Sequence, residues 1–267
     1  MVDARIVPLD RGRVRADRNY VIEGYELGSA TNPNPETEMI ETPVYNVVIE
    51  HPEATILWDT GSHPDAGDGY WPEFLYDAFE HYDADEHALE DDLGRAGYSI
   101  EKVDAVVQSH LHLDHAGGLY EFAGTDVPIY VHEAELKYAY YSAKTSEGDP
   151  AYLASDFDHE LNWRIVHGER ESHFEGIDFL HLPGHTPGLM GLHLTLPETG
   201  SVLVAGDQAY VAENYREERP LGPGLLWSKR DWYDSLRTLQ DLERREDATL
   251  FFGHDPGSLS RLEGGLR

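Results

Sequence analysis

The chain has 267 residues and no cysteine, which excludes disulfides and thiolate ligands, so any metal site must use nitrogen and oxygen. Its formal net charge of −31 at pH 7 argues against nucleic acid and anionic membranes as partners, because both would be repelled. The first residues lack the apolar core of a secretion signal, and no apolar stretch is long enough to span a bilayer, so we expect a soluble, cytoplasmic protein.

The acidic composition also indicates a habitat. Lysine is scarce, and a strongly acidic chain with few lysines is typical of a halophile that accumulates salt, where high ionic strength screens self-repulsion. An aromatic content of 11% and many apolar runs argue against a disordered chain. We expect one domain over residues 1–267, because no linker or internal repeat interrupts the sequence.

The first third of the chain predicts mostly strands. Residues 6–8 and 20–27 read as short strands, and a polar loop from Ser29 to Glu41 is long enough to reach over a site. Residues 44–50 and 55–59 predict a hairpin. The acidic but aromatic-rich segment 67–97 favours helices packed on a sheet over a substrate lid, although one segment can serve both purposes.

The remaining chain alternates apolar strand-like runs with two helices. A strand at 103–107 leads into the histidine-rich stretch Ser109–Gly118, and His132 lies between a strand and a helix, where a lone histidine is usually structural. The other predicted strands are 127–131, 163–166, 177–182, 192–196, 202–205 and 249–252, and the predicted helices are 133–143 and 232–244.

Four potential metal ligands fall within six positions of the stretch after strand 103–107: His110, His112, Asp114 and His115. Residues two apart on an extended backbone face the same way, so His110 and His112 can converge on one cation while the other two point elsewhere. So many titratable groups at a buried strand end are costly unless a cation offsets them. The spacing therefore predicts two metals side by side, and the ligand types suit zinc, iron, manganese or cobalt.

This HxHxDH pattern resembles the signature of the metallo-β-lactamase superfamily, over about residues 44–255. The resemblance implies an α+β fold, the αββα four-layer sandwich, with the metals at one rim. By analogy with dinuclear members, His110, His112 and His185 bind one metal, Asp114, His115 and His254 bind the other, and Asp207 bridges them. The resemblance also implies that Asp59 orients a metal-bound histidine, although an aspartate that caps a turn is an equally good interpretation.

Within the superfamily the chain most resembles the N-acyl homoserine lactonases, the quorum-quenching lactonases, with pyridoxolactonases as near relatives. The likeness rests on residues 109–118, on Asp207 followed three positions later by Tyr210, and on the segment 251–255. Departures from the family lie mainly in residues 67–97 and in the short C-terminus, which leaves the acyl-chain preference open.

The resemblance implies a catalytic scheme for a lactone or related ester as the small-molecule substrate. Two divalent ions, with Zn²⁺ the first choice over Mn²⁺, Fe²⁺ or Co²⁺, would yield a bridging hydroxide that attacks the ring carbonyl. Tyr210 would donate a hydrogen bond to the developing oxyanion, and Asp114 would shuttle the proton to the leaving oxygen. The other interpretation of Tyr210 is a core tyrosine with a satisfied hydroxyl.

Three alternatives remain open at this point. One is another hydrolase of the same fold, such as a thioesterase of the glyoxalase II type; a phosphodiesterase is disfavoured because no arginine or lysine cluster lies near the motifs. Another is a mononuclear iron enzyme like the persulfide dioxygenases, against which the retention of Asp114, His115 and His254 argues. The third is a metal-binding scaffold without catalytic activity, or a redox partner domain. The sequence is compatible with a monomer or a homodimer.

Overall fold

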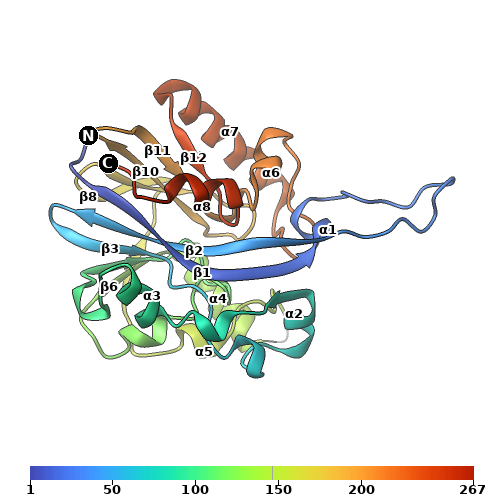
Figure 1. Cartoon of the computed structure of the whole chain (residues 1–267), viewed down its shortest axis with the longest axis horizontal. Helices are drawn as coiled ribbons and strands as arrows, with labels where there is room; N and C mark the ends of the chain where they lie inside the picture. The colour runs from blue at the N-terminus through green and yellow to red at the C-terminus, as the bar shows by residue number, and fades with distance from the viewer. Residues whose placement is uncertain (146) are drawn as a thin grey trace.

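Two β-sheets pack face to face, and helices cover their outer faces, in the computed structural model of residues 1–145 and 147–267 (Figure 1). This arrangement is the predicted αββα sandwich, and the predicted fold class is confirmed. No helix of these residues is long and apolar enough to cross a membrane.

The larger sheet has seven strands in the order β4-β1-β2-β3-β5-β6-β7, and the smaller has five in the order β12-β11-β10-β9-β8. Antiparallel pairs join β4, β1, β2 and β3, whereas β3, β5, β6 and β7 run parallel. The strands are β1 (Arg5–Asp17), β2 (Met39–His51), β3 (Ala54–Trp58), β4 (Phe79–His81), β5 (Ala105–Val107), β6 (Pro128–His132), β7 (Asn162–Val166), β8 (Arg170–Phe174), β9 (Ile177–His181), β10 (Met190–Leu196), β11 (Gly200–Val204) and β12 (Thr249–Phe251).

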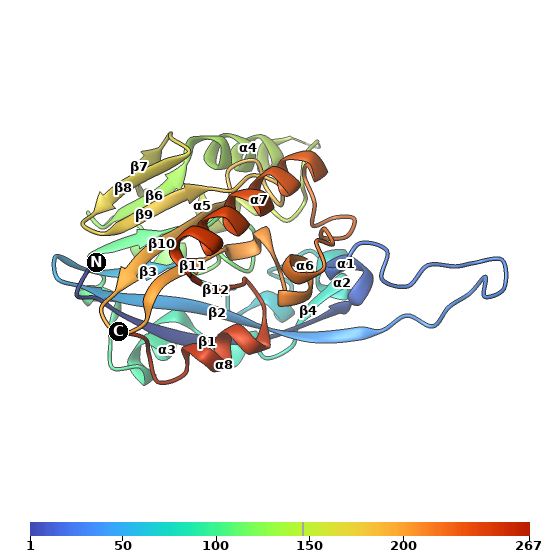
Figure 2. The same ribbon diagram turned by 90° about the horizontal axis from the view of Figure 1, so that it is seen from above.

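The helices lie outside the sheets, as the view from above also shows (Figure 2). They are α1 (Arg18–Val21), α2 (Glu73–Ala78), α3 (Leu89–Arg95), α4 (Glu133–Lys144), α5 (Ala154–Phe157), α6 (Ala212–Arg216), α7 (Lys229–Glu246) and α8 (Pro256–Leu262). Short 3₁₀ turns span Ala66–Asp68, Ala84–Glu86, Ile100–Lys102, Leu119–Phe122 and Gly206–Gln208.

The central strands are apolar on both faces because both faces are covered. In β2, Val47 and Ile49 belong to the core between the sheets, while Val48, on the opposite side, packs under the outer helices. In α7, Trp232, Leu236 and Leu239 form a buried stripe over the smaller sheet. The period-2 and period-3.6 patterns in the sequence therefore predicted these layers correctly.

The strand predicted at residues 20–27 is wrong. The Asp17 side chain accepts a hydrogen bond from the Asn19 backbone N–H and begins the helical turn α1, so local capping overrides the strand propensity of Tyr20, Val21 and Ile22. The loop that follows does not reach over a site; residues 27–34 are exposed, and the loop projects away from the sandwich (Figures 1 and 2).

The sequence also missed several elements. Strand β4 lies within segment 67–97 and pairs with β1, so that segment is not purely helical. Strand β8 lies at the edge of the smaller sheet and is largely polar, which removes the apolar signal of a strand. Helix α8 starts with Pro256 after an Asp255 cap that accepts from the Ser258 N–H, a start signal that was readable.

His132 has the structural role expected, because its Nδ1 caps α4 by accepting from the Ala134 N–H.

Candidate active site

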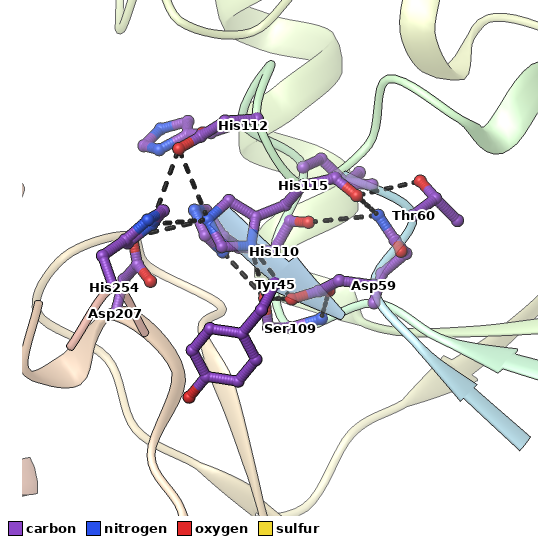
Figure 3. Close-up of polar contacts among 12 residues, drawn as sticks. Tyr45, Asp59, Thr60, Ser109, His110, His112, His115, Asp207 and His254 are labelled. Atoms are coloured by element: carbon purple, nitrogen blue, oxygen red, sulfur yellow. Dashed lines mark hydrogen bonds and ion pairs between the residues drawn. The ribbon is translucent and has the colours of Figure 1, made fainter. Parts of the chain in front are cut away.

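The loops that follow β5, β9, β11 and β12 meet at one rim of the sandwich and bring the predicted ligands together (Figure 3). Strands β11 and β12 are parallel neighbours, so Asp207 and His254, just beyond their carboxyl ends, lie side by side. Gly253 makes this approach possible, because a Cβ atom at that position would lie 2.0 Å from Oδ1 of Asp207.

The first cluster consists of His110, His112 and His185, all buried. Nε2 of His185 lies 3.1 Å from Nε2 of His110 and 3.0 Å from Nδ1 of His112. The three imidazoles thus direct one nitrogen each to a common point, as the spacing of His110 and His112 predicts.

The second cluster consists of Asp114, His115 and His254. Nε2 of His254 lies 3.3 Å from Nε2 of His115 and 3.5 Å from Oδ2 of Asp114. Asp114 is the most exposed member, with 16% of its side chain accessible, and it lines the adjoining cavity.

Asp207 lies between the two clusters. Its Oδ2 is 3.6 Å from Nε2 of His185 in the first cluster, and 3.5 Å and 3.3 Å from Nε2 of His115 and His254 in the second. Its Oδ1 is buried and has no protein hydrogen-bond partner among the described residues. A carboxylate in this position can contact two cations at once.

The outward nitrogens of four histidines are held by acceptors. Nδ1 of His185 donates to the Leu225 carbonyl at 2.6 Å and Nδ1 of His254 to the Pro43 carbonyl at 2.9 Å. Nδ1 of His110 donates to Ser109 Oγ, and Nδ1 of His115 donates to Asp59 Oδ2, each at 2.9 Å. In the neutral imidazoles these bonds fix the tautomer that leaves each Nε2 with a lone pair facing the clusters, which is the arrangement a metal-binding histidine needs.

His112 is turned the other way. Its Nδ1 faces the first cluster, and its Nε2 lies 3.4 Å from Oδ2 of Asp149 in the loop before α5. A second link ties this loop to the ligand turn, since the Leu113 N–H donates to the Ala151 carbonyl. Sequence reasoning missed Asp149, because nothing near it in the sequence marks it as a partner of His112.

Asp59 contacts the ligand turn directly. Its two oxygens accept from the N–H and the hydroxyl of Ser109, both at 2.7 Å, in addition to the bond from His115. Asp59 adopts a left-handed φ of +58°, a conformation that aspartate tolerates better than most residues. Asp59 thus lies beside His115 and also accepts bonds from the turn, so each of the two interpretations of this residue has a matching contact.

The electrostatics of the clusters fit divalent cations. Burial and the neighbouring imidazoles lower the pKa of His110 well below its usual value, and burial with His112 lowers that of His185 to about 4. Burial would raise the pKa of Asp207, but His254 and His115 lower it far below the usual range. Burial would lower the pKa of His115, but Asp207 and Asp114 raise it well above its usual value. The proton that His115 carries is therefore one that a bound cation would displace. Neutral imidazoles and ionised carboxylates are the ligands that zinc and similar ions prefer.

A cavity of about 510 Å³ opens over the clusters. Its floor includes Asp114, Asp207 and Tyr210, and its walls are mainly apolar: Trp71, Phe74, Leu75, Phe79, Tyr138, Leu225, Leu226 and Trp227. The ring of Tyr210 stacks on His254, with centroids 3.9 Å apart. Burial, Asp114 and Asp207 raise the pKa of Tyr210 well above its usual value, so its hydroxyl is a proton donor at neutral pH. Segment 67–97 therefore packs on the sheet and also lines the cavity.

A sandwich of two sheets that carries neighbouring histidine and aspartate clusters at one rim is typical of a metal-dependent hydrolase. The chain belongs to the Metallo-beta-lactamase superfamily, whose family model matches residues 39–254. The His/Asp clusters are consistent with the dinuclear metal site of lactonases of this superfamily.

Within the superfamily, the individual relatives that the chain resembles include N-acyl homoserine lactonases. The N-acyl homoserine lactonase AiiB of Agrobacterium fabrum is 29% identical over 97% of this chain and 96% of its own length. The N-acyl homoserine lactonase AiiA of Bacillus thuringiensis subsp. kurstaki is 30% identical over 88% of this chain and 89% of its own. A solved N-acyl homoserine lactone hydrolase with the product N-hexanoyl-L-homoserine at its catalytic metal centre superimposes with a TM-score of 0.82 at 27% identity, covering 98% and 97% of the two chains. The predicted family resemblance is confirmed.

Proposed function

We propose that the protein hydrolyses the ring ester of N-acyl homoserine lactones. The observation that carries the proposal is the cavity: it combines an apolar wall with a floor formed by both clusters and a buried phenol donor. A substrate with an apolar chain on a polar lactone ring matches this division. The similar proteins named above act on or bind such molecules, which supports the same substrate class here.

In this proposal His110, His112 and His185 would hold one divalent ion, Asp114, His115 and His254 would hold a second, and Asp207, which lies between the clusters, would serve both. Zinc is the proposed metal, because three imidazoles without a thiolate, next to carboxylates, form a common zinc ligand set. When bound, two such ions supply a water-derived nucleophile at neutral pH and polarise a carbonyl oxygen.

The residues of the chain supply orientation and proton transfer. Tyr210, held against His254, donates a hydrogen bond to the carbonyl oxygen of the lactone as negative charge develops there. Asp114 lies on the cavity floor and is partly accessible, and its carboxylate oxygen that does not face the second cluster would carry a proton to the ring oxygen as the C–O bond breaks. Water adds across the ester bond, and the product is the open-chain N-acyl homoserine.

The apolar wall would receive the acyl chain. Phe74 and Trp227 are exposed and Trp71 is a buried part of the same wall, so a long chain would displace water from aromatic surface. We therefore expect a preference for longer acyl chains over the shortest ones.

A direct test compares substrate classes. Protein reconstituted with zinc is incubated separately with N-hexanoyl homoserine lactone and with a glyoxalase II-type thioester, and the products are identified by mass spectrometry. The proposal requires the lactone to gain one water at a rate far above that of the thioester. Turnover of the thioester alone would reassign the site to the thioesterase alternative.

A further inference from the structure

A buried carboxylate outside the ligand clusters connects the two loops that carry the first of them. Glu135, in the first turn of α4, is fully buried, and both of its oxygens accept hydrogen bonds. Oε1 accepts from the Leu111 N–H at 2.9 Å and from the Tyr152 hydroxyl at 2.8 Å. Oε2 accepts from the Thr186 hydroxyl at 2.6 Å and from the Gly188 N–H at 3.2 Å.

The origin of these donors is informative. Leu111 stands between His110 and His112, and Thr186 directly follows His185, so the two oxygens of one side chain hold the two loops that supply the first cluster. Tyr152 adds a third link, because its ring lies edge-on to that of His112 with centroids 4.6 Å apart.

Close packing accompanies the hydrogen bonds. A Cβ atom at Gly188 would lie 2.1 Å from the backbone nitrogen of Glu135, so the turn that carries His185 can approach α4 this closely only with glycine there. A buried carboxylate is costly unless it is satisfied, and one with four donors holds each donor in a defined place. The second cluster has a different support, namely Asp59 on His115.

We propose that Glu135 is a positioning residue for the first metal site: it fixes the loop of His110 and His112 against the loop of His185, and so sets the metal affinity of the three-histidine cluster. We expect the effect to be concentrated on this cluster, because Thr186 and Gly188 belong to the loop of His185 and Tyr152 packs on His112. In the second cluster, His115 and His254 are held instead by Asp59 and the Pro43 carbonyl. The inference rests on the proposed metal site and not on the lactone substrate.

The test measures metal binding rather than activity. Metal-free wild-type protein and Glu135→Gln are titrated with Co²⁺ against a competing chelator, and the two binding steps are followed by visible absorption. The amide of glutamine would put an N–H₂ group against N–H and O–H donors. We expect the three-histidine step to weaken about 10- to 100-fold, as for other groups that orient metal-bound histidines, while the other step stays within about twofold.

Asp156→Asn is the matched control. Asp156 is also a buried carboxylate, and it accepts a hydrogen bond from the Tyr70 hydroxyl, but the structure records no bond from it to either ligand loop in the described residues. Its replacement should leave both Co²⁺ steps unchanged. Equal weakening of both steps in Glu135→Gln, or the same loss in Asp156→Asn, would show a general effect of a buried acid and overturn the proposal.

A milder pair of variants covers the case in which Glu135→Gln does not fold. Thr186→Val removes one donor and leaves the carboxylate, whereas Thr186→Ser keeps the hydroxyl. The valine variant should weaken the three-histidine step about tenfold, and the serine variant should restore it. If the Thr186→Val variant and the wild-type protein bind Co²⁺ with the same affinity in the three-histidine step, the proposal is wrong. Failure of every lactone in a protein whose Co²⁺ binding follows these predictions would refute the proposed function alone.

Discussion

Removal of the Tyr210 hydroxyl tests the catalytic proposal at one atom. Tyr210→Phe keeps the ring and its stacking on His254 but removes the only group of the side chain that can donate to a substrate oxygen.

The expected loss follows from the strength of such a bond. A hydrogen bond to a charged group contributes about 1.5 to 3 kcal/mol, and bound cations would share the charge of the oxyanion here, so the lower end applies. We expect kcat/KM to fall about tenfold, most of it in kcat, because the bond strengthens as the oxyanion forms.

The assay follows acid release from N-hexanoyl homoserine lactone, with metal content measured on the same samples. Tyr215→Phe is the control, since the Tyr215 hydroxyl donates to Glu243 in a separate cluster and its loss should leave kcat/KM unchanged. If Tyr210→Phe keeps its full metal content and an unchanged kcat, the Tyr210 hydroxyl has no catalytic role and the residue is a core tyrosine. A loss of metal in that variant would mean that the hydroxyl supports the metal site and not the substrate.

Three further outcomes are expected. Asp207→Ala should lower the bound metal from two ions per chain to fewer than one, and unchanged content by elemental analysis would contradict a bridging role. Burial raises the pKa of Asp156 in the folded protein to about 7, from an ordinary value of 3.8. The contribution of the neutral carboxyl to the free energy of unfolding is therefore fully present below about pH 3.8 and is lost as the pH rises through about 7. Between pH 5 and pH 8 the free energy of unfolding of Asp156→Asn should therefore rise relative to wild type by about 3 kcal/mol, since about two pH units below 7 contribute about 1.4 kcal/mol each, and a constant difference would refute this. The charge of −31 predicts a melting temperature that rises steadily from low to molar KCl; a flat response would remove the halophilic interpretation.

The layers of the fold were predictable because each central element buries two faces with a regular period. The alternating apolar residues of β2 and the apolar stripe of α7 each show which faces of the element are buried. Local polar contacts were harder to predict: a single bond from Asn19 to Asp17 is enough to start α1 where the apolar residues suggested a strand.

The candidate ligands were predictable for a different reason. They lie in short motifs at strand ends, and the topology brings strand ends together. The supporting residues were not predictable, because their contacts are distant in sequence. Glu135 is 24 positions from Leu111 and 51 from Thr186, and Asp149 reaches His112 only through the folded loop. A carboxylate in the first turn of a helix otherwise indicates no more than favourable placement near the helix dipole.

The proposed lactonase activity is tested most directly by ring opening across a series of N-acyl homoserine lactones, from butanoyl to dodecanoyl. Protein in concentrated salt is stripped by chelator and reloaded with zinc, and acid release is measured at each stage. We expect activity that disappears when the metal is stripped and returns with two equivalents of zinc. We also expect a kcat/KM that rises with chain length, by up to about fourfold for each buried methylene. Protein that holds two metals and opens none of these lactones would contradict the central claim.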